Sequence, residues 1–137
     1  MHVTPFIYFY GRCEEALDFY AAVFGGSYEV LTRNTATPLE HAHRLTPAFR
    51  DKVSAAKFRA GEMTIMGSDG AGPRELTGDD GNISLSVTMP DANAGARAFD
   101  ALSDGGHVKV PFESVPWGGH MGVVQDRFAT EWIITVD

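Results

Sequence analysis

One helix-and-strand pattern occurs twice in this sequence, and the duplication constrains the fold more than any other feature. In each half an amphipathic helix ends at a Gly-Gly pair, first at Gly25-Gly26 and again at Gly105-Gly106. Identical residues recur at an offset of 80 positions, as in 105 − 25. The matched pairs are Phe19 and Phe99, Ala21 and Ala101, Gly25 and Gly105, Gly26 and Gly106, and Val30 and Val110. This self-similarity predicts two copies of one supersecondary unit.

Apolar periodicity places the helices and strands within each copy. The first helix has apolar residues at three- and four-residue steps from Cys13 to Phe24, and the second starts at Asp91 as N-cap and continues to Leu102. Alternating or continuous apolar runs predict strands at residues 3–9, 28–32, 53–59, 63–66, 83–89, 108–113, 121–125 and 131–136. We therefore predict an α+β fold in which residues 1–137 form a single domain of two βαβββ modules, at 1–70 and 78–137. Each helix has one apolar stripe, so each should pack on one side of a curved sheet.

Charge and cysteine content exclude several classes of protein. The 137 residues include 11 Lys plus Arg and 18 Asp plus Glu, so the formal net charge is −7, and the charges are spread thinly. A nucleic-acid partner is not expected, because a phosphate backbone requires a concentrated basic patch. The single cysteine cannot form an internal disulfide, and neither a signal peptide nor an apolar run of membrane-spanning length is present. We expect a soluble, cytoplasmic protein with no membrane partner.

Two stretches rich in loop-forming residues interrupt the strands. Residues 68–81 are dominated by Gly, Pro, Asp and Ser and predict the connector between the modules. Residues 33–52 form a loop long enough to be a lid or a subunit contact. In that loop His41 and His43 have no third ligand nearby in sequence, which favours a solvated loop over a metal site. Cys13 lies on the apolar stripe of the first helix, which favours a buried thiol over a nucleophile.

Three residues near the end of the chain are candidates for chemistry or ligand contact. Trp117 precedes a Gly-Gly pair that would let a ligand approach the backbone closely. His120 follows beside a strand expected to border a cavity, although a hydrogen-bonded turn residue would fit the same position. Glu131 is a candidate base on the last strand, or simply an exposed charge.

Residues 82–87 alternate cleanly between small polar and apolar side chains. Asn82, Ser84 and Ser86 fall on one face of the expected strand, and the apolar residues between them fall on the other. Such a polar face fits the concave, wet side of a sheet, although a face turned to bulk solvent would have the same pattern. We take these residues as candidate pocket lining.

Three phrases of the sequence carry a family resemblance. They are PFIYFYGRCEEALDFYAAVFGG near the start, GEMTIMGSD at residues 61–69, and WGGHMGVVQDRFATEWIITV at the end. Together with the paired modules they resemble the PhnB-like branch of the vicinal oxygen chelate superfamily, which also contains glyoxalase I, bleomycin-resistance proteins and extradiol dioxygenases. The resemblance implies a half-open barrel in which two modules flank a pocket, and a homodimer, for which Phe6, Tyr8 and Phe112 are candidate contacts. Some relatives are labelled demethylubiquinone methyltransferases, but no glycine-rich nucleotide loop follows the first strand here.

The resemblance also implies where a divalent metal would bind in metal-dependent members. Its four ligand positions correspond to Pro5, Met66, Asn82 and Ile133, none of which is a good ligand for a divalent cation. In the third strand, Ala55 and Lys57 replace the histidine and the acidic or amide residue of many relatives. We expect no metal at these positions and no cofactor.

Three functions follow as alternatives. The leading one is binding of an unidentified small organic molecule between the modules, either to sequester it or to act on it with His120 or Glu131 as general acid-base catalyst. The expected pocket residues are Met66, Asn82, Ser84, Trp117 and Gln125. The second is a metal-dependent lyase, dioxygenase or transferase with displaced ligands. The third is a non-catalytic interaction module.

Overall fold

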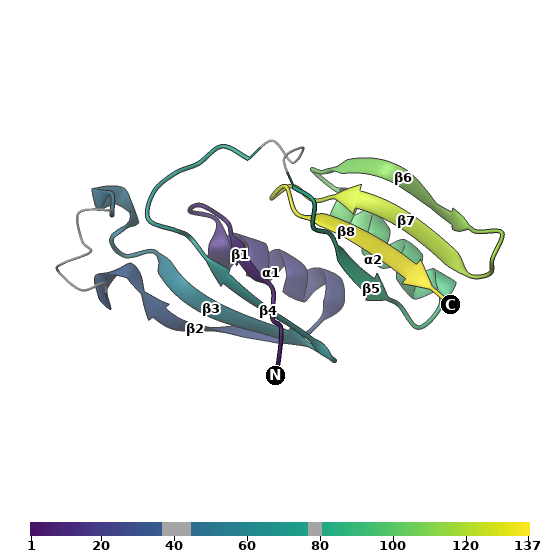
Figure 1. Ribbon diagram of the computed structural model, residues 1–137, viewed down its shortest axis with the longest axis horizontal. Helices are drawn as coiled ribbons and strands as arrows, with labels where there is room; N and C mark the ends of the chain where they lie inside the picture. The colour runs from purple at the N-terminus through teal and green to yellow at the C-terminus, as the bar shows by residue number, and fades with distance from the viewer. Residues whose placement is uncertain (37–44, 77–80) are drawn as a thin grey trace. The chain divides into compact units, whose positions relative to one another are not determined.

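The computed structural model describes residues 1–36, 45–76 and 81–137, and it divides into two compact units (Figure 1). The first unit, residues 1–75, contains β1 (Phe6–Tyr8), α1 (Cys13–Phe24), β2 (Ser27–Arg33), β3 (Val53–Ala60) and β4 (Met63–Ser68). The second, residues 76–137, contains β5 (Leu85–Thr88), α2 (Ala92–Ser103), β6 (His107–Ser114), β7 (His120–Gln125) and β8 (Glu131–Val136). Short 3-10 turns lie at Asn34–Ala36 and Pro47–Phe49. His41 and His43 fall outside the described residues.

Both units have the same topology. The first sheet has the order β1-β4-β3-β2 and the second the order β5-β8-β7-β6, with a parallel β1–β4 or β5–β8 pair beside antiparallel neighbours. This arrangement confirms the predicted pair of βαβββ modules. The first and fifth strands are shorter than expected, because Val3 and Ile83 lie outside the hydrogen-bonded ladders and are exposed.

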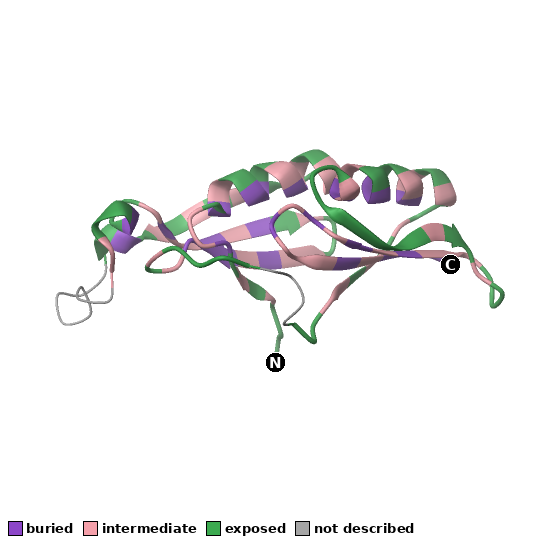
Figure 2. Cartoon of the chain, turned by 90° about the horizontal axis from the view of Figure 1, so that it is seen from above, coloured by how far each residue is buried: buried purple, intermediate pink, exposed green. Residues whose placement is uncertain are grey.

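Each helix covers one face of its own sheet, and its buried residues face that sheet (Figure 2). In α1 the buried residues are Cys13, Ala16, Leu17 and Tyr20, and the Tyr20 ring lies 6.4 Å from that of Phe58 in β3. In α2 they are Gly95, Ala98, Phe99 and Leu102, and Phe99 stacks at 5.7 Å on Phe112 in β6. Burial of these residues against the sheet adds to the apolar stabilisation of each unit.

The second glycine of each Gly-Gly pair has the same packing role. A Cβ at Gly26 would overlap the carbonyl oxygen of Arg59 in β3, and a Cβ at Gly106 would overlap that of Gln125 in β7. The chain thus passes so close to the neighbouring strand that only glycine fits. This equivalence gives the sequence repeat a structural cause.

A buried carboxylate holds the start of α1 in place. Arg12 at the N-cap makes no side-chain capping bond, whereas Asp91 caps α2 as predicted by accepting from Ala94 N–H at 2.8 Å. In α1 the carboxylate of Asp69, 2% exposed, accepts from Cys13 N–H and from Val53 N–H, each at 2.7 Å. One side chain therefore joins the helix start to the start of β3.

Candidate functional site

Strand register assigns the side chains of the second sheet to two faces. Opposite pairs share a face, and Val124 pairs with the buried Trp132 on the side of α2. The alternate residues lie on the other side, which we name the helix-free face of the second sheet. They are Ser84, Ser86 and Thr88 near or in β5, Glu131, Ile133 and Thr135 in β8, and Met121, Val123 and Gln125 in β7. Ser84 and Ser86, two of the polar residues in the predicted alternation, therefore lie on this face.

Glu131 is the centre of a hydrogen-bonded cluster on this face. The hydroxyl of Ser84 donates to Oε2 of Glu131, and Nζ of Lys109 donates to Oε1 at 2.7 Å. The Lys109 and Glu131 side chains are 31% and 28% exposed. Gln125 is the register partner of Glu131 across β7 and β8, so its side chain emerges beside the cluster. The structure therefore brings Ser84 and Gln125, two of the expected pocket residues, close to Glu131, one of the two expected catalytic residues.

Hydrogen bonds and a neighbouring charge favour the ionised form of Glu131 and weaken it as a general base. The hydrogen bond from Lys109, followed by that from Ser84, lowers the pKa of Glu131 below its ordinary value of 4.5, against a smaller opposing effect of burial. A carboxylate with a lowered pKa holds a proton less readily and is a weaker general base. Its geometry suits a fixed hydrogen-bond acceptor.

His120 lies apart from Glu131. Its register partner is the buried Val136, so it emerges on the side of α2, and its ring stacks on Phe112 at 5.5 Å with an interplanar angle of 23°. His120 and Gln125, at the two ends of β7, are five positions apart, roughly 17 Å along the strand. His120 and Glu131 therefore occupy opposite faces and opposite ends, and they do not form an acid-base pair.

The remaining candidates are also spread out. Trp117 is 76% exposed in the turn between β6 and β7, at the end of the sheet away from Glu131. Asn82 is exposed ahead of β5. Met66 belongs to the first sheet, in β4, where it pairs with Phe6 and Lys57.

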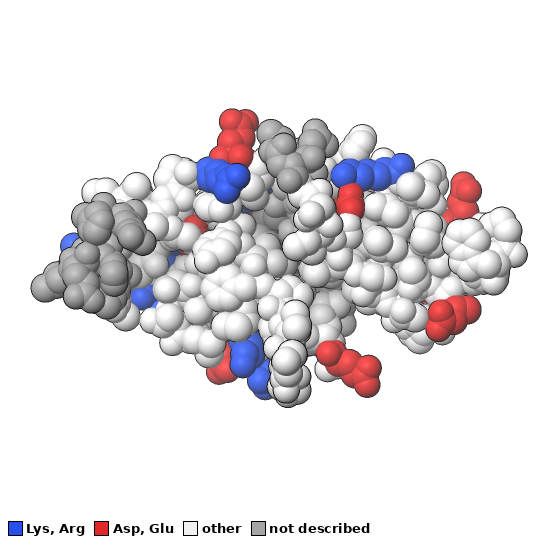
Figure 3. Space-filling model, viewed as in Figure 1, with Lys and Arg blue, Asp and Glu red and all other residues white. Residues whose placement is uncertain are grey.

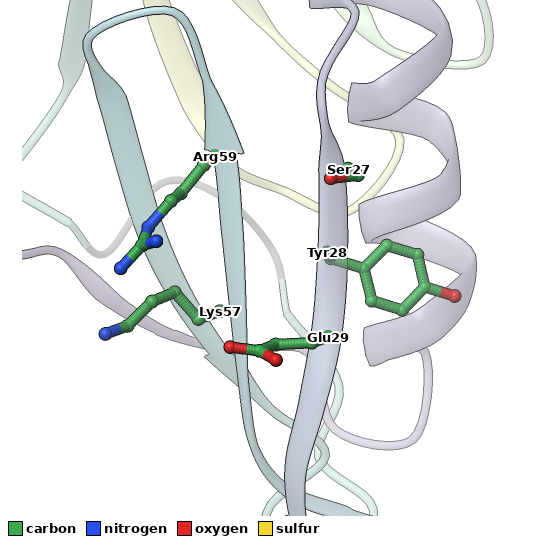
Figure 4. Close-up of a pocket in the computed structure, with 5 residues that line it drawn as sticks. All are labelled: Ser27, Tyr28, Glu29, Lys57 and Arg59. Atoms are coloured by element: carbon green, nitrogen blue, oxygen red, sulfur yellow. The ribbon is translucent and has the colours of Figure 1, made fainter.

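The first sheet has a hollow that the sequence analysis did not predict (Figure 4). It measures about 260 Å³ and is lined by Ser27, Tyr28, Glu29, Lys57 and Arg59. Figure 4 shows Lys57 and Arg59 directed away from α1 and the Tyr28 ring directed toward it. The alternation of Lys57 and Arg59 with the buried Ala56 and Phe58 is the sequence signal that could have identified this face.

The residues at the family's metal positions do not fit a divalent cation. The carbonyl of Pro5 accepts from Met66 N–H at 2.8 Å, so these two are neighbours, but neither side chain supplies oxygen or nitrogen. Ile133 is paired with Ser86, four residues beyond Asn82, so Asn82 and Ile133 are not register neighbours. Within residues 1–36, 45–76 and 81–137, no three His, Cys, Asp or Glu residues cluster as a metal site would require.

Cys13 is a buried thiol rather than a nucleophile. It has no exposed surface, and burial, aided by the negative charges of Asp69 and Glu14, raises its pKa to about 12. A thiol in this state is almost entirely protonated near neutral pH.

Charges are dispersed on the face of the molecule drawn in Figure 3, where the Lys and Arg side chains of the described residues stand apart from one another. None of the helices in the described ranges is both long and apolar enough to cross a membrane.

Comparison with known proteins gives the class and then the family. A structure from the glyoxalase/bleomycin resistance protein/dioxygenase superfamily, from Sphaerobacter thermophilus, matches at a TM-score of 0.54 with 17% identity over 100% of this chain and 98% of that one. Such a match shows the shared fold, that of the vicinal oxygen chelate proteins.

A family model described as 3-demethylubiquinone-9 3-methyltransferase matches residues 1–135. The chain therefore belongs to this PhnB-like family. Protein PA1353 from Pseudomonas aeruginosa is 27% identical, with a TM-score of 0.81 over 100% of this chain and 98% of that one. A PhnB protein from Bacillus cereus, titled a putative 3-demethylubiquinone-9 3-methyltransferase, is 22% identical, with a TM-score of 0.80 and full coverage of both chains.

Proposed function

We propose that this protein binds a small organic molecule on the helix-free face of its second sheet, by hydrogen bonds and apolar contacts, without a divalent metal. The observation that carries this proposal is the Ser84–Glu131–Lys109 cluster. It is a preorganised polar group beside the apolar Val123 and Ile133 of the same face. Ligand sites combine apolar lining with a few fixed polar groups of this kind.

Binding suits the cluster better than acid-base catalysis. Both carboxylate oxygens of Glu131 already have a protein donor, and each retains a further acceptor site for an N–H or O–H of a ligand. The lowered pKa keeps that acceptor charged. His120, our other candidate for general acid or base, stacks on Phe112 on the opposite face.

The family name raises methyl transfer as another activity, and the first β–α turn argues against it. Residues 9–12 between β1 and α1 read Phe-Tyr-Gly-Arg, with one glycine and no glycine-rich nucleotide loop. Superfamily members differ widely in chemistry on one fold, so function has to be argued from the site.

A homodimer is the second part of the proposal. Of the three candidate aromatic contacts, Phe112 is half-buried and packs against Phe99 and His120 within its own unit. Phe6 and Tyr8 are 43% and 51% exposed, so they can still contribute. Sedimentation of a single 14.8 kDa species at micromolar concentration would remove the homodimer from the proposal.

The test is a thermal-shift screen of metabolite-like compounds against metal-free protein without an affinity tag. A ligand that binds only the folded state stabilises it by about 2.7 kcal/mol at a hundredfold excess over its Kd. The midpoint temperature of unfolding rises as a result. We expect active compounds to stabilise the wild type and the matched control Glu62→Gln, in the β3–β4 turn, but not Glu131→Gln.

Two results would contradict the proposal. One is a screen in which no compound stabilises the wild type. The other is zinc, nickel, manganese or iron found near one equivalent in the untagged protein by elemental analysis, and required for binding.

A further inference from the structure

The helix-free face of the first sheet combines cationic and aromatic side chains in one row. Register aligns Phe6 of β1 with Met66 of β4, Met66 with Lys57 of β3, and Lys57 with Glu29 of β2. All four side chains therefore emerge on the same face, away from α1. Adjacent strands are about 4.8 Å apart, so Phe6 and Lys57 are about 10 Å apart across the sheet.

The cationic end of this row is the hollow of about 260 Å³ (Figure 4). Arg59 follows Lys57 on the same face, two residues along β3, and is paired with Ser27. Among the residues that the structure describes, neither cation is in a salt bridge. Glu29 supplies one negative charge against two positive ones, so the hollow is cationic in a chain of net charge −7.

The aromatic end of this row is a series of neighbouring rings, those of Phe6, Tyr8 and Tyr10, which extends beyond the end of β1. The Phe6 and Tyr8 rings are 5.3 Å apart, and the Tyr8 and Tyr10 rings are stacked at 6.0 Å. Arg74 lies over the Tyr10 ring at 5.7 Å and donates to its hydroxyl at 3.3 Å, which holds that end of the series. Phe6 and Tyr8 are about half exposed, so ring faces or edges remain free for stacking.

We propose that this face binds a planar aromatic anion, with its acidic group in the hollow at Lys57 and Arg59 and its ring over Met66 against Phe6 and Tyr8. This site belongs to the first sheet and does not include the Glu131 cluster, so the proposal goes beyond the proposed function. A guanidinium and an ammonium favour a carboxylate or sulfonate through charge-assisted hydrogen bonds. The thioether of Met66 adapts its shape to a ring and makes favourable sulfur–aromatic contacts. The hollow is smaller than pockets for drug-sized ligands, which favours a molecule of one or two rings.

The test is titration of the full chain with 2-naphthoate, with binding measured both from amide chemical shifts and by calorimetry. Two related probes separate the contributions: 2-naphthamide keeps the rings without the charge, and cyclohexanecarboxylate keeps the charge without the aromatic ring. We expect 2-naphthoate to bind at millimolar concentration or below, with chemical-shift changes confined to β1, β2, β3 and β4 of the first sheet. The neutral amide and the non-aromatic acid should each bind at least tenfold more weakly.

Substitutions test which side chains contact the acidic group and which contact the ring. We expect Lys57→Gln with Arg59→Gln to weaken 2-naphthoate at least tenfold, and Phe6→Leu to weaken it severalfold. The matched charge control is Arg97→Gln, at an exposed position of α2, which should bind as the wild type does. Retained wild-type amide dispersion in each variant shows that it is folded.

Four outcomes would overturn the inference: no binding of 2-naphthoate, equal binding of the amide, equal binding by the Lys57/Arg59 double variant, or shifts confined to the second sheet. The thermal-shift screen distinguishes this failure from a failure of the proposed function. Compounds that stabilise the wild type but not Glu131→Gln would support the proposed function at the second sheet even if 2-naphthoate did not bind to the first sheet. A screen without any active compound would remove the proposed function as well.

Discussion

Lys109 Nζ lies 2.7 Å from Glu131 Oε1 on the face of the second sheet that α2 leaves uncovered. The pair joins the edge strand β6 to β8, although β7 lies between them in the sheet. Together with the hydroxyl of Ser84 it keeps a carboxylate charged and oriented. That fixed acceptor is the basis of the function proposed above.

The Glu131 cluster predicts a specific pH dependence of stability. The folded-state pKa of Glu131 is lowered, chiefly by Lys109, so the ionised form stabilises the fold above the ordinary value of 4.5. That contribution is lost as pH falls through the lower folded-state pKa. We expect the difference in urea midpoint between wild type and Glu131→Gln to be constant from pH 7 to about 5 and to shrink at lower pH. A difference that grows as pH falls would contradict the assigned direction.

Removal of the Asp69 carboxylate should destabilise the first unit strongly. Asp69→Ala leaves the buried N–H groups of Cys13 and Val53 without their acceptor, at a cost of about 3 kcal/mol in the free energy of unfolding. The comparison is Asp91→Ala, which removes an exposed N-cap at a cost of about 1 kcal/mol. Urea unfolding measures the loss of stability in both variants. Equal losses would show that the burial of Asp69 does not strengthen its contribution to the free energy of unfolding.

The Gly-Gly pair offers a test within two adjacent residues. Both Gly25 and Gly26 have positive φ, of 77° and 83°, so alanine strains either by about 1–2 kcal/mol. Only at Gly26 would the new Cβ also overlap a backbone carbonyl, that of Arg59. We expect Gly26→Ala to lower the thermal midpoint clearly more than Gly25→Ala, as read by circular dichroism. The reverse order would refute the close-approach explanation of the repeat.

Cys13 should be inert until the first unit unfolds. Its thiol is fully buried and its pKa is raised to about 12, first by desolvation and then by Asp69 and Glu14. At pH 8 we expect iodoacetamide to label it far more slowly in the native protein than in urea, as followed by mass spectrometry. Labelling of the native protein at the rate of a free cysteine would contradict its placement.

Local sequence patterns predict most of the fold but little of the candidate site. Helix ends at Gly25, the N-cap Asp91 and the order of strands are all properties of neighbouring residues, and these were predicted. Asp69 caps a helix 56 residues away in sequence, a pairing that no local pattern records. The face of the sheet on which His120 lies could not be predicted from the sequence for a related reason.

The strand that begins at His120 has small or apolar residues at both alternating sets of positions. Gly122 and Val124 are buried on one side, and Met121 and Val123 lie on the other, so periodicity alone cannot decide where His120 points. The register with β8 decides it, by pairing His120 with Val136. Similarly, Trp117 is three residues before His120 in sequence but lies in an exposed turn.

The most direct test of the central claim is a crystal structure of the protein with a compound that stabilises the wild type but not Glu131→Gln. We predict ligand density on the helix-free face of the second sheet, within hydrogen-bond distance of Glu131, with no metal ion between ligand and protein. Density on the side of α2 near His120, or a ligand held through a coordinated metal, would contradict it.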